Sequence, residues 1–171
     1  MNIVLIGYRG TGKSVVAEIL SKALRMKRIG MDAEIVNQAG LSIPEIVEKY
    51  GWDRFRNIET EVAVKVSQLD GVIADTGGGV IERPENIEAL KKNGVIFWLK
   101  ASVEVIVARI ESGTERPALT EGKSFTEEVA EVLEKRTQKY SSAAQYEIDT
   151  DKLAPDEVAD RILEIWKNIS S

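Results

Sequence analysis

The sequence contains no cysteine and no histidine among its 171 residues. The absence of cysteine excludes a disulfide framework, a thiolate zinc site and a cysteine nucleophile. The absence of histidine removes the commonest general base and with it the Ser-His-Asp triad. Any proton transfer must therefore use a carboxylate, a lysine or a tyrosine. With only 4 prolines and 13 glycines, the chain also lacks the composition of collagen or of a low-complexity segment.

Long apolar runs and an excess of basic charge are also missing. The longest apolar stretch, 94–99, ends at Lys100 and is far shorter than the roughly 20 residues that a membrane-spanning helix needs. The 28 acidic residues outnumber the 23 basic ones, which gives a formal charge of −5 and disfavours a broad nucleic-acid surface. No targeting segment is visible at the start of the sequence. We therefore expect a soluble cytoplasmic protein with neither membrane nor nucleic acid as a partner.

The order of apolar patterns is typical of a parallel α/β sheet in one domain spanning 1–171. Short β-branched runs predict five strands, at 2–6, 27–30, 71–75, 95–99 and 146–149. Stretches of helical period predict helices at 14–24, 43–49, 59–69, 85–92, 103–110, 124–140 and 155–169. The first strand shows no polar alternation, so we expect both its faces to be buried. Trp52, Trp98 and Trp166 are expected to be packed in the core or at its edge.

The strongest motif is Gly7-Tyr-Arg-Gly-Thr-Gly-Lys13-Ser14, a full G-x-x-x-x-G-K-[ST] match between a strand and a helix. Glycines let the backbone N–H groups of such a loop point at phosphate oxygens, and the helix N-terminus adds positive charge. The lysine can bridge the β and γ phosphates, and the serine hydroxyl can ligate Mg²⁺. The motif predicts a nucleoside triphosphate site with these residues: Gly10, Thr11, Gly12, Lys13, Ser14 and Val15.

Five further features narrow the class of P-loop protein. Asp32 follows the second strand, and Phe55-Arg56-Asn57-Ile58-Glu59 opens a helix. Thr76-Gly77-Gly78-Gly79 follows the third strand. Arg116-Pro117 lies in a predicted mobile lid at 111–123, and Arg136-Thr-Gln-Lys-Tyr140 ends the long helix. With the P-loop, this set resembles the shikimate kinase family over nearly the whole chain.

The resemblance implies a three-layer α/β P-loop kinase with helices on both faces of the sheet. It also implies ATP and Mg²⁺ as co-substrate and cofactor, and phosphorylation of the 3-hydroxyl of shikimate in chorismate and aromatic amino-acid biosynthesis. A monomer is expected. The substrate segment is expected at 31–60.

Shikimate carries a carboxylate and three hydroxyls, so its site needs fixed cations and one acceptor. Arg56 and Arg136 would clamp the carboxylate, since guanidinium is a planar, bidentate donor. Glu59 would orient this pair of arginines, and Asp32 would hold the acceptor hydroxyl and could take its proton. Taken alone, Arg56 and Glu59, three residues apart on a helix, are better explained as a surface ion pair, and only the family spacing reverses this preference.

The remaining roles also follow from the resemblance. Gly77, Gly78 and Gly79 would let the sugar-like ring approach the backbone. Arg116 would neutralise charge on the transferred phosphoryl group. Arg109 would pack against the adenine.

The sequence departs from the family pattern at two places. The family usually carries D-x-D after the second strand, but this chain has Gly30-Met31-Asp32-Ala33-Glu34. One register places Asp32 on the substrate aspartate and Gly30 on the magnesium one; the other pairs Asp32 with Glu34. We prefer the first, in which the magnesium-side carboxylate is missing. We hypothesise that Asp75 replaces it beside Ser14, although Asp75 could equally cap the glycine turn.

The second departure follows the last strand, where relatives often present an arginine to the adenine. Here either Lys152 would substitute for it, or the nucleotide would be held less selectively.

Two rival functions stay open at this stage. One is another small kinase of the same fold, acting on gluconate or a nucleoside monophosphate. The other is a nucleotide-binding module that has lost catalysis, which only Gly30 favours.

Overall fold

A single parallel sheet forms the centre of the molecule in this computed structural model, which describes residues 1–112 and 124–171. The strands are β1 (Asn2–Ile6), β2 (Lys27–Gly30), β3 (Val72–Asp75), β4 (Gly94–Lys100) and β5 (Tyr146–Asp149). They lie in the order β2-β3-β1-β4-β5, and every neighbouring pair is parallel. The prediction of a five-stranded parallel sheet is confirmed.

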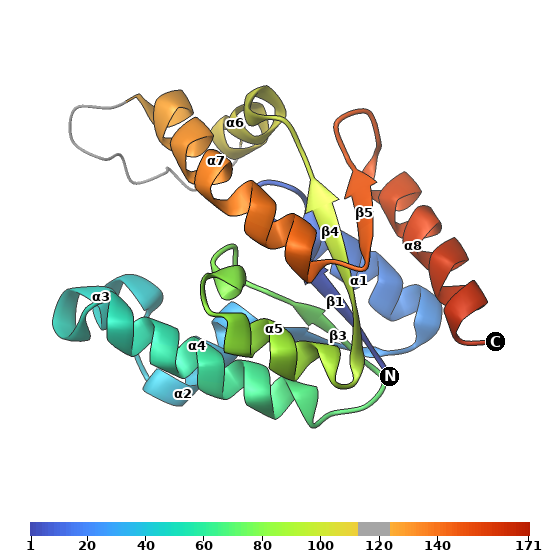
Figure 1. Cartoon of the computed structure of the whole chain (residues 1–171), viewed down its shortest axis with the longest axis horizontal. Helices are drawn as coiled ribbons and strands as arrows, with labels where there is room; N and C mark the ends of the chain where they lie inside the picture. Colours follow the sequence, from blue (N-terminus) through green and yellow to red (C-terminus); the bar gives the residue numbers. More distant parts are fainter. Residues whose placement is uncertain (113–123) are drawn as a thin grey trace.

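Helices cover both faces of this sheet, which confirms the three-layer α/β architecture (Figure 1). Near the strands' carboxyl ends and over one face lie α2 (Met31–Ala39), α3 (Ile43–Tyr50), α4 (Trp52–Ser67), the short 3₁₀ helix η1 (Val80–Glu82) and α5 (Pro84–Lys91). The other face carries α1 (Lys13–Leu24) and α8 (Pro155–Ile169). The remaining pair is α6 (Val103–Glu111) and α7 (Phe125–Ala143), which pack on each other.

The unbroken apolar sequence of β1 is explained by a core on each side. Val4 and Ile6 join the cluster under α4 and α5, whereas Ile3 and Leu5 join the cluster under α1 and α8. Successive side chains of a strand point to opposite faces, so both cores need apolar residues from the same five positions. The expected burial of both faces is confirmed, since all five residues of β1 are buried.

The order of strands places the functional loops together. β1 pairs with β3 on one side and with β4 on the other. The chain therefore runs from β1 toward one edge of the sheet, to β2, and later returns to the other side of β1, to β4. In open α/β sheets the crevice at such a switch point is where ligands bind. Residues that directly follow β1, β2 and β3 line one pocket at this edge.

Two predicted boundaries in the segment 31–60 are wrong. Residues 31–39 form α2, although the sequence predicts no helix here, because only Met31 and Ile35 are buried and two residues make too short an apolar stripe. Helix α4 begins at Trp52, ahead of both the Phe55 start that the motif indicates and the Glu59 start of the apolar pattern. Trp52 itself is 60% exposed, so the expected packing holds only for Trp98 and Trp166. In the described residues, no helix is both long and apolar enough to cross a membrane.

Candidate active site

Two adjoining pockets lie at the carboxyl edge of the sheet. The first, called the P-loop pocket, has a volume of about 540 Å³ and combines the loop after β1 with the ends of β2 and β3. Its lining comprises Arg9, Gly10, Gly12, Lys13, Ser14, Val15, Arg28, Gly30, Asp32, Ala33, Asp75, Thr76, Gly77 and Gly78. The second, called the arginine pocket, has about 840 Å³ and is lined by Trp52, Asp53, Arg56, Glu82, Arg83, Val132, Lys135, Arg136 and Lys139.

The P-loop has the backbone shape that phosphate binding needs. Gly10 and Gly12 have φ angles of 83° and 91°, a left-handed conformation that side chains disfavour. Helix α1 then begins at Lys13 without any side-chain cap. The amide groups of its first turn are therefore free of side-chain acceptors and available to an anion. Thr11 is buried and closes the loop by donating to the Tyr8 carbonyl at 2.8 Å.

Lys13 lies inside this loop with 8% of its surface exposed. Its ammonium group donates to the Gly7 carbonyl at 2.6 Å and to the Tyr8 carbonyl at 3.0 Å. Burial lowers the pKa of Lys13 to about 8, although the carboxylates of Asp75 and Asp32 act in the opposite direction. The loop thus holds a lysine that is mostly charged at neutral pH but loses its charge as the pH rises above 8, and bound phosphate oxygens would favour the charged form.

Ser14 and Asp75 are brought together as the sequence hypothesis required. The Ser14 hydroxyl donates to Asp75 Oδ2 at 2.8 Å, although 61 residues separate them. Hydroxyl and carboxylate oxygens are the hard ligands that Mg²⁺ takes together with substrate phosphates, so this pair fits the metal. Among the described residues no cluster of three or more acidic side chains could hold a metal by itself. Nucleotide oxygens and water would have to complete the coordination.

Asp32 lies at the start of α2, beside the glycine loop that follows β3. A Cβ atom on Gly77 would come within 2.8 Å of Asp32 Oδ1 and 3.3 Å of Glu59 Oε2, so only glycine leaves room here. Loss of hydration in the pocket raises the pKa of Asp32, with Lys13 opposing the effect. Glu34 lines a different pocket, together with Lys27. The geometry therefore supports the register that aligns Asp32 with the substrate aspartate and leaves Gly30 without a carboxylate.

Arg56 is held on the inner side of α4 by a buried carboxylate. It donates to Glu59 Oε1 at 2.8 Å and to the Gly79 carbonyl at 3.2 Å. Glu59 is only 1% exposed and Arg56 only 17%, so this is no surface ion pair. Burial raises the pKa of Glu59, while Arg56 opposes this. A Cβ atom on Gly79 would overlap the Arg56 guanidinium, so that glycine is required by close approach.

The opposite wall of the arginine pocket is helix α7. Arg136 donates through Nε to Glu82 Oε1 at 3.0 Å, and Lys139 donates to the other oxygen of Glu82 at 3.1 Å. The Nη1 atom of Arg136 lies beside the glycine loop, since a Cβ atom on Gly78 would be 3.5 Å from it. Tyr140 is fully buried and donates to the Gly78 carbonyl, which fixes the loop against α7.

The outer wall of the same pocket carries an aromatic side chain. The Arg56 guanidinium lies 5.6 Å from the centre of the Trp52 ring, and the Trp52 and Phe55 rings meet edge to face at 5.8 Å. Such contacts restrict the arginine without using its hydrogen-bond donors.

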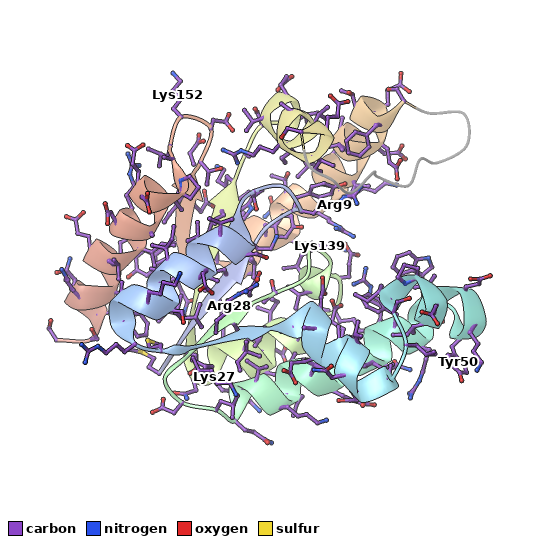
Figure 2. The ribbon with its side chains drawn as sticks, turned by 180° about the vertical axis from the view of Figure 1, so that it is seen from behind. Arg9, Lys27, Arg28, Tyr50, Lys139 and Lys152 are labelled. Atoms are coloured by element: carbon purple, nitrogen blue, oxygen red, sulfur yellow. The ribbon has the colours of Figure 1, made fainter. Side chains whose placement is uncertain are left out.

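Three residues predicted on the adenine and lid side have different outcomes. Arg109 lies next to the P-loop, where it donates to the Thr150 side chain at 3.0 Å, to the Thr150 carbonyl at 2.9 Å and to the Gly10 carbonyl at 3.5 Å. Lys152 lies at the tip of the loop after β5 and points away from the molecule (Figure 2). The structure thus does not bring Lys152 to the P-loop pocket. Arg116, with most of the predicted lid at 111–123, lies outside the described residues.

Several residues of the site escaped the sequence reading. Glu82, which accepts a hydrogen bond from Arg136, ends the short helix η1 and belongs to no motif. Arg28 donates to Asp75 Oδ2 at 2.7 Å, and strand alternation could have found it, because Arg28 and Gly30 share one face of β2. Arg9 lies at the loop of the P-loop pocket with its guanidinium 5.8 Å from the Phe125 ring (Figure 2).

Known proteins resemble this chain in sequence and in fold. The family model described as "Shikimate kinase" matches residues 9–167. The shikimate kinase of Thermodesulfovibrio yellowstonii is 41% identical over 170 residues, which cover 99% of this chain and 97% of that protein. The solved structure of Acinetobacter baumannii shikimate kinase in complex with shikimate superimposes with a TM-score of 0.89 at 32% identity, covering 98% of this chain and 93% of that one.

A second solved structure agrees. Shikimate kinase from Aquifex aeolicus gives a TM-score of 0.82 at 31% identity, with 99% of this chain and 98% of that chain covered. Sequence and structural similarity both extend over nearly the full length of the chain. The chain therefore belongs to the shikimate kinase family.

Proposed function

We propose that this chain transfers the γ-phosphoryl group of ATP to the 3-hydroxyl of shikimate, giving shikimate 3-phosphate and ADP. The observation that carries the proposal is the position of Asp32. Its carboxylate lines the P-loop pocket with Lys13 and is close enough to both Lys13 and Arg56 for their charges to act on it. A substrate hydroxyl beside Asp32 would therefore lie between the phosphate loop and the arginine pocket.

On the nucleotide side, the first turn of α1 and Lys13 would bind the phosphates. Ser14 and Asp75 would hold Mg²⁺, which supplies charge neutralisation to the phosphate oxygens when bound. Arg109 is proposed, by family resemblance, to lie beside the base; Thr150 and the Gly10 carbonyl hold its guanidinium at the edge of the P-loop. Arg116 on the lid is proposed, by family resemblance alone, to neutralise the transferred group. Lys152 would need to turn inward to contact the base.

On the acceptor side, Arg56 and Arg136 would clamp the carboxylate of shikimate from opposite walls of the pocket. Each is oriented by its own acidic partner, Glu59 and Glu82 respectively. Glycines 77–79 would let the ring approach the backbone. The raised pKa of Asp32 makes its carboxylate a stronger base than an exposed one, which suits acceptance of the hydroxyl proton. Catalysis would then rest mainly on positioning and charge neutralisation.

The test is ADP release from Mg·ATP with shikimate, and in parallel with gluconate, CMP and AMP. Release that depends on shikimate alone supports the proposal. Arg56→Ala and Arg136→Ala should each weaken shikimate binding by about 100-fold, because a charge-assisted bidentate pair is lost, while ATP binding changes little. Arg54→Ala is the matched control, since Arg54 is exposed on the same helix and lines neither pocket.

Two outcomes would contradict the proposal. Release with another acceptor would keep the kinase fold but overturn the assignment of the arginine clamp. ATP binding without turnover on any acceptor would favour a nucleotide-binding module.

A further inference from the structure

In the P-loop pocket, Arg28 forms an ion pair with Asp75, the carboxylate that is proposed to hold the metal. Arg28 lies on the edge strand β2, and Gly30, two residues on, pairs in register with Asp75 of β3. Because Gly30 has no side chain, the long Arg28 side chain can reach Asp75 diagonally across the two strands. Arg28 Nη2 lies 2.7 Å from Asp75 Oδ2, and a Cβ atom on Gly30 would lie 4.0 Å from the same nitrogen.

The same carboxylate oxygen serves two donors. Asp75 Oδ2 accepts from the Arg28 guanidinium at 2.7 Å and from the Ser14 hydroxyl at 2.8 Å. Asp75 is only 7% exposed, so little water is available to it. A divalent cation that took Ser14 and Asp75 as ligands would meet the positive guanidinium at this oxygen, and the two cations would repel each other.

The net charge of the P-loop pocket also disfavours binding of a divalent cation in the absence of nucleotide. The described residues that line the P-loop pocket include three cations, Arg9, Lys13 and Arg28, but only two carboxylates, Asp32 and Asp75. A pocket with excess positive charge does not attract a bare divalent cation. Phosphates of a nucleotide would reverse this balance.

The guanidinium also has an alternative to its present position. Arg28 Nε is buried and has no hydrogen-bond partner in the part of the chain that the structure describes. A buried donor without an acceptor costs free energy. The Asp75 pair therefore leaves Arg28 incompletely satisfied, and a phosphate oxygen in the pocket could serve as the missing acceptor.

We propose that Arg28 competes with the divalent metal for Asp75 and thereby sets the metal requirement of this enzyme. Arg28 holds Asp75 while the pocket contains no nucleotide and releases it when nucleotide and metal bind together. Arg28 is thus a positioning residue that acts through Asp75. The inference rests on the proposed function, because it takes Ser14 and Asp75 as the metal side of an ATP site.

The experiment is a Mn²⁺ titration followed by electron paramagnetic resonance, with saturating ADP and no shikimate. Mn²⁺ takes the same oxygen ligands as Mg²⁺ and reports binding without turnover. Arg28→Met keeps the length of the side chain but removes its charge. We expect it to tighten Mn²⁺ binding about fivefold, the effect of one half-exposed charge, whereas Arg28→Lys should stay close to the parent.

The chain offers a matched control on the same strand. Lys27→Met removes one charge from the neighbouring residue of β2, whose side chain is exposed and lines a different pocket (Figure 2). Its Mn²⁺ affinity should equal that of the parent. Equal tightening in Lys27→Met and Arg28→Met would mean that general charge, not competition for Asp75, controls the metal, and would overturn the inference.

A second variant tests the same competition by giving Arg28 another carboxylate to pair with. Gly30→Asp meets only ordinary contacts at its Cβ, and its backbone φ of −81° suits any residue. The new carboxylate should pair with Arg28, free Asp75 and tighten Mn²⁺ binding as well. Unchanged Mn²⁺ affinity in both Gly30→Asp and Arg28→Met, with circular dichroism equal to the parent, would contradict the proposal. If the parent itself bound no Mn²⁺ with ADP, the proposed function would fail first and the inference with it.

Discussion

At the scale of single residues, the buried lysine of the P-loop has the clearest consequence. The pKa of Lys13 is lowered to about 8 by burial, so the nucleotide-free protein loses this charge as the pH rises above 8. Bound phosphates favour the charged form and raise the pKa again. Binding of ADP at pH 9 should therefore take up nearly one proton, while binding at pH 7 should take up almost none.

Calorimetry in two buffers of different ionisation enthalpy measures that proton directly. Lys13→Arg is the control, because arginine stays charged throughout this range and should bind without proton uptake. Equal uptake by the parent at pH 7 and pH 9 would contradict the assignment.

Asp75 gives a second expectation at the same scale. Asp75→Asn keeps an oxygen for the Ser14 hydroxyl but removes the charge that would favour Mg²⁺. The concentration of Mg²⁺ needed for half-maximal activity should rise about tenfold, whereas shikimate affinity should stay nearly unchanged because Asp75 lines only the P-loop pocket. A Mg²⁺ titration identical to that of the parent would show that Asp75 only supports the turn.

The site residues that belong to motifs could be predicted from the sequence, whereas the residues that hydrogen-bond to them could not. Lys13, Ser14, Arg56 and Arg136 stand in recognisable patterns, because each reaction step needs a particular side chain at a particular spacing. Glu82 contacts Arg136, 54 residues further along the chain, and Arg28 contacts Asp75, 47 residues further along. No local sequence pattern indicates such contacts. The burial of Glu59 likewise depends on how α4 packs under the glycine loop.

At the scale of elements, α3 is the helix on the substrate side whose N-terminus is capped by a side chain. Helix α3 begins with a capping box in which the Ser42 hydroxyl accepts from the Glu45 amide at 3.3 Å and Glu45 accepts from the Ser42 amide at 3.4 Å. Ser42→Ala should lower the free energy of unfolding by about 1 kcal/mol. Urea denaturation measures this loss of free energy. Ser67→Ala is the control, because Ser67 lies at the carboxyl end of α4, where its hydroxyl donates to the Val64 carbonyl and caps no helix N-terminus. Equal losses in both variants would argue against the cap.

The elements were predictable where apolar patterns are long. Strand β1 and helices α1 and α8 supply buried residues over many positions, and the sequence identified all three. Helix α2 contributes two buried residues, so its pattern is too weak to separate from a loop. The first turns of α4 were missed because Trp52 faces solvent and the polar residues after it face a pocket, not a core.

At the scale of the whole molecule, a basic pocket lies in an acidic protein. The net charge is −5, yet the arginine pocket brings five cations together against two carboxylates. Local charge should therefore control the binding of anionic ligands. Raising NaCl from about 0.05 M to about 0.5 M should weaken shikimate binding severalfold, because the screening length falls below the size of the pocket.

A neutral ester of shikimate is the control for this salt dependence, because it lacks the negative charge of the carboxylate. It should bind more weakly at every salt concentration and show little dependence on salt. An equally steep salt dependence for acid and ester would place the effect outside the pocket.

The exposed Trp52 offers a practical consequence of the contact with Arg56. Trp98 and Trp166 are buried, so Trp52 is the tryptophan whose ring meets both solvent and the guanidinium. Any ligand that draws Arg56 toward itself changes the electric field at this indole. The native emission spectrum of the chain should thus report occupancy of the arginine pocket without any added dye. Since the sequence has no cysteine, one introduced thiol could accept a second fluorophore without background labelling, and energy transfer from Trp52 would then follow the pocket in real time.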